Sequence, residues 1–223
     1  MIAWQELGRA KVPHGDLVLS RRGDEFAIRL RGAELMNSRM HQSEDQLATW
    51  GCAGFAARSG VRVLIGGLGM GFTARAALDV LAPDARVVIA ELLPEVIEWN
   101  RGPLAHLAGA PLDDPRVEVV QGDVGALIAR ARGFYNAILL DVDNGPDAFT
   151  APGNAALYSV GGLERARRAL APAGRFGVWS VADDKPFTGR LRGRGFDVDV
   201  HKIPARAGSG ANHVVWIARS PDR

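Results

Sequence analysis

From residue 61 onward, short apolar runs alternate with segments whose apolar residues have helical spacing. Ala74, Ala77, Leu78 and Leu81, for example, recur at i, i+3, i+4 and i+7 after the first run. Strands that are apolar throughout and separated by helices are typical of a parallel sheet with both faces covered. Connections that pass through a helix from one parallel strand to the next are right-handed, so the pattern predicts a doubly wound α/β sheet. The predicted strands are 61–65, 86–90, 116–120, 135–140, 175–181 and 213–218.

Residues 1–60 have a different pattern. Phe26, Ile28 and Leu30 alternate with less apolar residues, as expected of a half-buried strand, and turn sequences stand at 22–24 and 31–32. This segment predicts a small β-hairpin or meander. Residues 43–46 match a capping box, which predicts a helix that begins at Ser43. We therefore expect two domains, a small N-terminal β-portion over 1–42 and the doubly wound α/β domain over 43–223.

Composition limits the partners and the compartment. The net charge of +2 is too small to require nucleic acid as a partner, and no long uncharged apolar run predicts a membrane segment. One cysteine, Cys52, cannot form an intrachain disulfide, and the N-terminus does not resemble a signal peptide. We expect a cytoplasmic protein. The five histidines are scattered without metal-ligand spacing, so no metal is expected.

A glycine-rich loop follows the first predicted strand. Gly66, Gly67, Gly69 and Gly71 leave the backbone bare at the carboxyl end of the strand, where ligands of such sheets bind. A dinucleotide fingerprint that starts at Gly67 requires a small residue at the position of Phe72. The spacing is closer to the nucleoside-binding loop of class I enzymes that use S-adenosylmethionine. An NAD-dependent oxidoreductase is accordingly disfavoured.

Two acids follow the next two predicted strands. Glu91 lies about 20 residues after the glycine loop, where a carboxylate accepts hydrogen bonds from ribose hydroxyls. Asp123, with Val124 beside it, follows the third strand and is placed to accept a bond from the adenine amino group. Taken alone, Asp123 is better explained as a helix N-cap. The loop and the two acids, in register with successive strands, together predict a nucleoside pocket.

A third acidic segment closes the fourth predicted strand. Asp141 and Asp143 would face the reactive end of a bound nucleoside, where a carboxylate takes a proton from an attacking amine or offsets a sulfonium charge. Asp143 lies in a sequence of turn formers, which favours a structural role for it. Asp141 is the predicted catalytic residue.

These features together resemble those of the spermidine/spermine synthase (aminopropyltransferase) family from about residue 16 to the C-terminus. The resemblance implies a Rossmann-like, class I methyltransferase-like sheet and decarboxylated S-adenosylmethionine as donor. It also implies a small amine as acceptor and a possible homodimer through the N-terminal β-portion. Asp141 would be the proton acceptor, and Asp143 and Tyr158 would contact the acceptor. The segments that carry the resemblance are the glycine loop 66–71, Glu91, Asp123, the segment 141–146 and Tyr158.

The chain departs from the family pattern on the acceptor side. The family's loop aspartate is Gly69 here, and its second fourth-strand aspartate falls on Asn144 unless Asp143 replaces it. Three interpretations therefore stand. The chain is an aminopropyltransferase, or a methyltransferase that uses S-adenosylmethionine on an unknown small acceptor, or a non-catalytic relative that binds a nucleoside.

Overall fold

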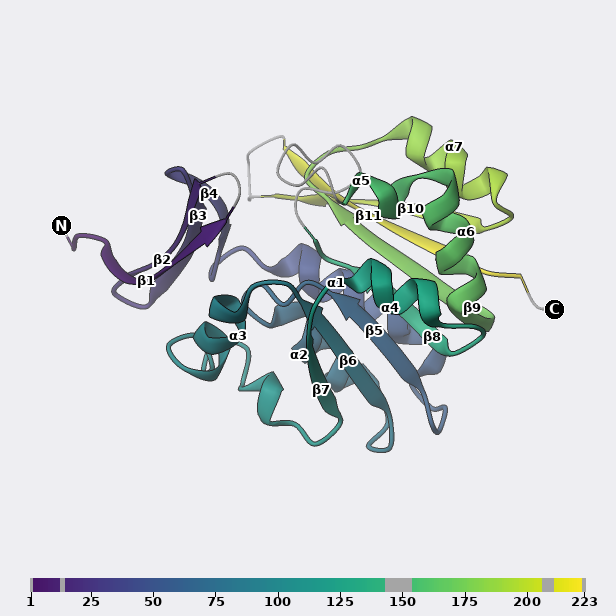
Figure 1. Ribbon diagram of the computed structural model, residues 1–223, viewed down its shortest axis with the longest axis horizontal. Coiled ribbons are helices and arrows are strands. Elements are labelled where there is room, and N and C mark those ends of the chain that lie inside the picture. The colour runs from purple at the N-terminus through teal and green to yellow at the C-terminus, as the bar shows by residue number, and fades with distance from the viewer. Residues whose placement is uncertain (1, 13–14, 143–153, 206–210, 222–223) are drawn as a thin grey trace.

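The computed structural model describes residues 2–12, 15–142, 154–205 and 211–221, which form two sheets (Figure 1). The N-terminal sheet is an antiparallel meander in the order β1-β2-β3-β4. It therefore has two more strands than a single hairpin, and Gly23 and Gly32 take positive φ in its tight turns. Its strands are β1 (Gln5–Val12), β2 (Gly15–Arg22), β3 (Glu25–Leu30) and β4 (Ala33–Asn37).

The second sheet has seven strands in the order β10-β11-β9-β8-β5-β6-β7. Its neighbours from β9 to β7 pair in parallel, whereas β11 runs antiparallel to both β9 and β10. The doubly wound α/β prediction is confirmed, with an antiparallel pair added at one edge. The strands are β5 (Arg62–Gly66), β6 (Arg86–Glu91), β7 (Val117–Gln121), β8 (Tyr135–Leu140), β9 (Leu170–Ser180), β10 (Asp197–Pro204) and β11 (Asn212–Arg219).

Helices cover both faces of this sheet, and successive strand residues point into opposite cores. Ile65 and Leu139 belong to the core under α1 (Gln42–Cys52), α2 (Phe72–Val80) and α3 (Pro94–Arg101). Leu64 and Leu140 belong to the core under the helices of the other face. Those helices are α4 (Val124–Arg130), α5 (Ala155–Tyr158), α6 (Val160–Ala169) and α7 (Lys185–Gly193). Two short 3₁₀ helices, η1 (Ala53–Phe55) and η2 (Pro111–Asp113), complete the described elements.

The capping box predicted at Ser43 is wrong. α1 begins at Gln42 after His41, and no side chain caps its first turn. Ser43 is buried inside that turn, and its hydroxyl is hydrogen-bonded to Glu44 and to His213 of β11. A tertiary contact thus takes the hydroxyl that the sequence pattern assigned to a cap.

The N-terminal sheet lies at the side of the molecule that carries α3 (Figure 1). A Cβ at Gly8 would lie 2.4 Å from Trp99 Nε1 of α3, so the two surfaces meet without room for a side chain. The sulfur of Met36 would lie 3.3 Å from a Cβ at Gly69. β4 therefore forms one wall beside the loop. The boundary between residues 42 and 43 stays a prediction. Among the helices of the described residues, none is long and apolar enough to cross a membrane.

Candidate functional site

The glycine loop and Asp141 meet at the point where the strand order reverses. After β5 the chain adds β6 and β7 on one side of β5, and it then adds β8 and β9 on the other side. The Asp141 amide donates to the Gly66 carbonyl at 2.8 Å, and the Gly67 amide donates to the Ala90 carbonyl at 2.9 Å. Ligands of doubly wound sheets bind at this crevice. The structure therefore brings the two predicted segments together.

Close approach explains the glycine at position 67. Its φ is +89°, and a Cβ there would lie 2.2 Å from the Asp141 carbonyl oxygen. Gly69 and Gly71 also have positive φ, and Gly71 precedes the first residue of α2. At Gly66 a Cβ would lie 3.0 Å from the Val124 side chain, so Val124 packs directly over the end of β5.

Two polar side chains hold the loop. Glu91 accepts hydrogen bonds from the Leu68 amide at 3.0 Å and from the Leu93 amide at 2.9 Å. Asn100, which is buried on α3, donates to the Gly69 carbonyl at 2.8 Å. The sequence analysis missed Asn100, because nothing local distinguishes it from other polar residues of a helix. The Glu91 carboxylate thus ties the backbone of the loop to the end of β6.

Asp123 caps α4. Its carboxylate accepts from the Gly125 amide at 2.8 Å, and the side chain is exposed at the edge of the sheet. The structural alternative raised by the sequence is therefore present in the molecule. It occupies one carboxylate oxygen and does not conflict with a ligand at the other.

Asp141 is a half-buried carboxyl at the carboxyl end of β8. Thr73, the second residue of α2, donates to its Oδ2 at 2.5 Å. Burial raises the pKa of Asp141 to about 6, and the Thr73 hydrogen bond opposes that rise. A carboxylate with such a pKa is a better proton acceptor than an ordinary aspartate and is still ionised at neutral pH.

Glu44 is a second acid that the sequence analysis missed. It lies in the first turn of α1, where burial and then the charge of Asp141 raise its pKa to about 7. Ser43 donates to its Oε2 at 2.5 Å, and Ser43 Oγ is 2.8 Å from His213 Nδ1. One sequence signal could have identified Glu44. It lies three residues before Leu47, which places it on the same, buried face of the predicted helix.

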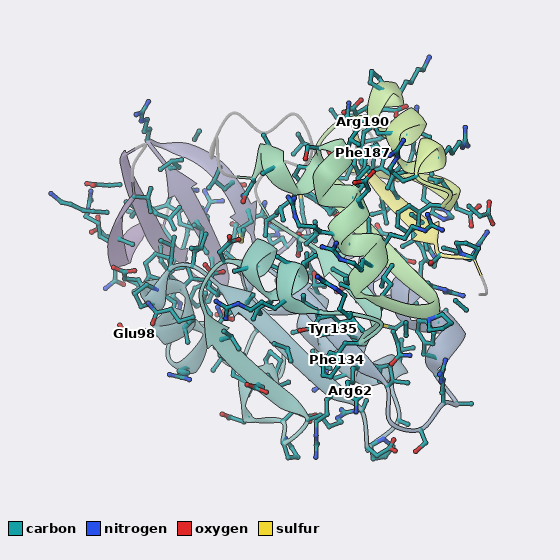
Figure 2. The ribbon with its side chains drawn as sticks, turned by 45° about the vertical axis from the view of Figure 1, so that its right-hand side comes forward. Arg62, Glu98, Phe134, Tyr135, Phe187 and Arg190 are labelled. Atoms are coloured by element: carbon teal, nitrogen blue, oxygen red, sulfur yellow. The ribbon has the colours of Figure 1, made fainter. Side chains whose placement is uncertain are left out.

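The remaining predicted residues lie elsewhere. Tyr158 is buried in the core beside α7, edge-on to Phe187 with ring centroids 5.7 Å apart. Figure 2 labels Phe187 on α7 beside Arg190. The packing of Tyr158 is that of a core aromatic, and its contact with an acceptor stays a prediction. Asp143 lies outside the described residues. Among the described residues, no group of three or more His, Cys, Asp or Glu side chains could hold a metal ion.

Comparison with known proteins agrees with this architecture, although no family model matches the chain. A polyamine aminopropyltransferase of Mycobacterium tuberculosis (strain H37Rv) is 34% identical over 164 residues, which is 71% of this chain and 29% of that protein. Polyamine aminopropyltransferase 1 of Streptomyces coelicolor is 37% identical over 122 residues, or 53% of this chain and 22% of its own length. The chain thus spans less than a third of these curated relatives.

Solved structures show the same fold over nearly the whole chain. A spermidine synthase in complex with the transition-state analogue AdoDATO superposes with a TM-score of 0.78 and 19% identity, covering 98% of this chain and 74% of the other. The spermidine synthase of Thermotoga maritima has a TM-score of 0.74 and 18% identity over the same shares of the two chains. Together with the curated relatives, these matches show that the chain belongs to the spermidine synthase/polyamine aminopropyltransferase family.

Proposed function

We propose that this protein binds the adenosine part of decarboxylated S-adenosylmethionine and transfers its aminopropyl group to a small amine. The observation that carries the proposal is the position of Asp141. Its carboxyl has a raised pKa and lies at the point where the strand order of the sheet reverses. The backbone carbonyl of Asp141 packs against Gly67 of the glycine loop. That combination supports a role for Asp141 as proton acceptor next to the crevice in which the donor would lie.

The proposed step moves one proton. The amine lone pair attacks the propyl carbon bonded to the sulfonium, a C–N bond forms, and the C–S bond breaks with its electron pair passing to sulfur. The products are a neutral thioether and a substituted ammonium ion, which carries the positive charge that the sulfonium had. Because an ammonium ion has no lone pair, the acceptor must lose a proton before it attacks, and Asp141 takes that proton. The sulfonium supplies the reactivity, and the protein supplies orientation and the base.

The nucleoside part of the pocket would be formed by the glycine loop, Glu91, Asp123 and Val124. The Glu91 carboxylate would accept from the ribose hydroxyls, and the second carboxylate oxygen of Asp123 would accept from the adenine amino group. Val124 would offer an apolar surface to the base. A homodimer through the N-terminal sheet also stays a proposal.

Two variants of Asp123 separate its capping role from its proposed role in binding. Asp123→Ala removes the cap, so we expect the free energy of unfolding to fall by about 1 kcal/mol. Asp123→Asn keeps a capping oxygen but presents an amide to the base, so stability should stay within about 0.5 kcal/mol while nucleoside affinity falls. Thermal unfolding and calorimetry with 5′-methylthioadenosine measure the two effects. Unchanged affinity in both variants would limit Asp123 to capping.

Methyl transfer from S-adenosylmethionine is the second candidate function. Gly69 brings no carboxylate to the loop, and the neutral sulfur of Met36 lies where a side chain at 69 would extend. A loop without an acid at position 69 repels less strongly the carboxylate that the methyl donor keeps and the decarboxylated donor lacks. The two functions therefore differ in the tail of the donor.

Calorimetry with the two donors, followed by mass spectrometry of the products, distinguishes these functions. We expect tighter binding of decarboxylated S-adenosylmethionine and a mass increase on the amine that corresponds to one aminopropyl group. Preference for S-adenosylmethionine with methylated product would support methyl transfer. Binding of 5′-methylthioadenosine without either product would indicate a non-catalytic relative, and no binding of any of the three nucleosides would refute the proposed pocket.

A further inference from the structure

A hollow lies between the last turn of α6 and the end of α7, two helices that lie side by side over β9 and β10 (Figure 1). Its volume is about 610 Å³, which is within the range of small-molecule sites. Half of its lining is arginine, so the hollow is a candidate site for an anion. The described residues that line it are Glu164, Arg167, Arg168, Gly193, Arg194 and Gly195.

This hollow lies at the edge of the second sheet that is opposite to Asp141. α6 ends at Ala169, and β9 begins at Leu170. Leu170 pairs with Tyr135, the first residue of β8, whereas Asp141 follows the last residue of β8. Because the residues of β8 span about 20 Å, a ligand in the hollow would not enter the candidate active site.

Arg167 has bonding capacity that the described residues do not use. Its Nε is buried and has no hydrogen-bond partner among them. None of the ion pairs between described residues involves Arg167 or the exposed Arg168, whereas Arg194 Nη1 pairs with Glu164 Oε1 at 2.6 Å. A buried donor without a partner is costly, so a ligand that accepts from Arg167 is favoured.

The helix dipole does not by itself account for Arg167. Cations are favoured near the end of a helix, where they bond to its last carbonyls. Arg132 does this just after α4, where its Nη1 donates to the Ala129 and Ala131 carbonyls at 3.1 and 3.0 Å. The Nε of Arg167 donates to no described carbonyl. Its guanidinium lies beside Gly195, where a Cβ would be 3.6 Å from Arg167 Cζ.

A second hollow, of about 440 Å³, begins on the other side of Gly195, which lines both hollows. We call the two together the basic groove. The second hollow adds three arginines, Arg58, Arg175 and Arg219. The two linings together hold six arginines and two acids, a net charge of +4, whereas the whole chain has a net charge of +2. Positive charge is therefore concentrated in the basic groove.

Arg175 brings a partly buried guanidinium to the second hollow. Its Nη1 donates to the Trp50 carbonyl at 2.6 Å, and no described acid forms an ion pair with it. Burial and then the charge of Arg219 lower the pKa of Arg175. Arg219 is itself paired with Asp197 and Asp199, at 2.8 Å each. An anion beside Arg175 would offset the repulsion between the two guanidinium groups.

The lining favours a phosphate chain over other anions. Guanidinium groups bind phosphate oxygens in pairs, and several of them along a groove match a ligand with several charges in a row. Phe55 is the one aromatic side chain among the described lining residues, and it is only 4% exposed. The bases of a single-stranded nucleic acid would therefore find no ring on which to stack.

We infer that the basic groove binds a linear phosphate chain, either that of inorganic polyphosphate or that of a nucleoside triphosphate. The chain would lie against Arg167 and Arg168 in the first hollow and extend past Gly195 toward Arg58 and Arg175. This inference does not depend on the proposed transfer reaction, because the two sites lie at opposite edges of the sheet.

Calorimetry of the full chain with inorganic tripolyphosphate tests the first hollow. We expect it to bind at least about 10-fold more tightly than orthophosphate, because several guanidinium groups contact one chain. Arg167→Gln should weaken its affinity by about 5-fold or more, and so should Arg168→Gln, whose exposed side chain is not needed for folding.

The matched control is Arg101→Gln. Arg101 is exposed and lies in the last turn of α3, as Arg167 lies in that of α6, so both variants remove the same charge from the same place in a helix. The control should change the affinity by less than about 2-fold. Equal losses in Arg101→Gln and Arg167→Gln would show diffuse attraction and overturn the inference. So would tripolyphosphate that binds no more tightly than orthophosphate.

UTP distinguishes the two sources of the phosphate chain, and without adenine it does not compete for the proposed nucleoside pocket. Affinity for UTP above that for tripolyphosphate supports a nucleoside triphosphate, and equal or lower affinity supports inorganic polyphosphate. A single-stranded RNA that binds more tightly than polyphosphate of equal charge overturns the inference in favour of nucleic acid.

Arg58→Gln tests whether the ligand extends into the second hollow. It should weaken the binding of a longer polyphosphate by about 3-fold or more and leave that of orthophosphate unchanged. An unchanged affinity for the longer chain overturns the assignment of the second hollow. None of these measurements requires turnover, so a protein that transfers nothing to an amine would refute the proposed function and leave this inference standing.

Discussion

Replacing Asp141 by asparagine should lower kcat by about 10²- to 10⁴-fold, because the proposed proton acceptor is removed while the shape of the site is kept. The affinity for 5′-methylthioadenosine should stay within about 3-fold of wild type, since Asp141 is assigned to the amine and not to the nucleoside. Asp24→Asn, at a side chain that is fully exposed in a turn, is the matched control. A rate within about 3-fold of wild type would remove Asp141 from the proposed mechanism.

The pH dependence gives a second signature of the same residue. The ionised carboxylate is the active form, so the wild-type rate should rise with pH through the Asp141 pKa of about 6 and level off above it. The asparagine variant should lack that rise. The pH profiles of kcat for the two proteins measure the difference.

Whereas the rate should rise with pH, the free energy of unfolding should fall with pH over the same range. The pKa values of Asp141 and Glu44 are raised to about 6 and about 7, so the folded state holds protons that the unfolded chain has lost. Stability therefore falls as pH rises from about 4 to about 7 and then stays level. At pH 8 we expect Asp141→Asn to be more stable than wild type by about 1–2 kcal/mol, a value discounted for partial exposure. Thermal unfolding at pH 5 and pH 8 tests the sign.

Replacing Gly67 by alanine should be the most disruptive single change in the loop. An alanine would have to adopt a φ of +89° and would place its Cβ 2.2 Å from the Asp141 carbonyl oxygen. We expect a loss of at least about 3 kcal/mol in the free energy of unfolding, together with loss of nucleoside binding. Because the clash is with backbone, a side-chain rearrangement cannot relieve it.

A control isolates the close approach from the backbone strain. Gly60 has a φ of +67°, but a Cβ there would meet nothing within 4 Å. Gly60→Ala should therefore cost only about 1 kcal/mol and leave nucleoside binding intact. Chemical denaturation and calorimetry compare the two variants. Equal losses in both would show that the contact between Gly67 and Asp141 is unimportant.

The sheet and the order of its parts were predictable from local patterns. The apolar runs at 61–65 and 135–140 correspond to β5 and β8, and the positions of Glu91 and Asp141 at strand ends follow from where those runs stop. The antiparallel arrangement of β11 was not predicted, because a run of apolar residues does not indicate strand direction.

The residue roles that the sequence did not predict belong to residues whose partners are distant in sequence. Ser43 matched a local cap but bonds to His213, which is 170 residues away. Asn100 is an ordinary helical polar residue until the fold brings Gly69 to it. Short-range spacing contains no information about such pairings, so no local pattern could have identified them.

By itself, the sequence determined the alternation of strands and helices, the glycine loop and the acids that end successive strands. Hydrophobic periodicity and glycine placement are properties of neighbouring residues, and parallel strands bring their carboxyl ends to one edge. Only the tertiary structure decided that Glu44 lies near enough to Asp141 for the charge of Asp141 to raise its pKa. That proximity depends on how α1 packs on β8 at Gly51 and Leu139, which is a contact between segments far apart along the chain.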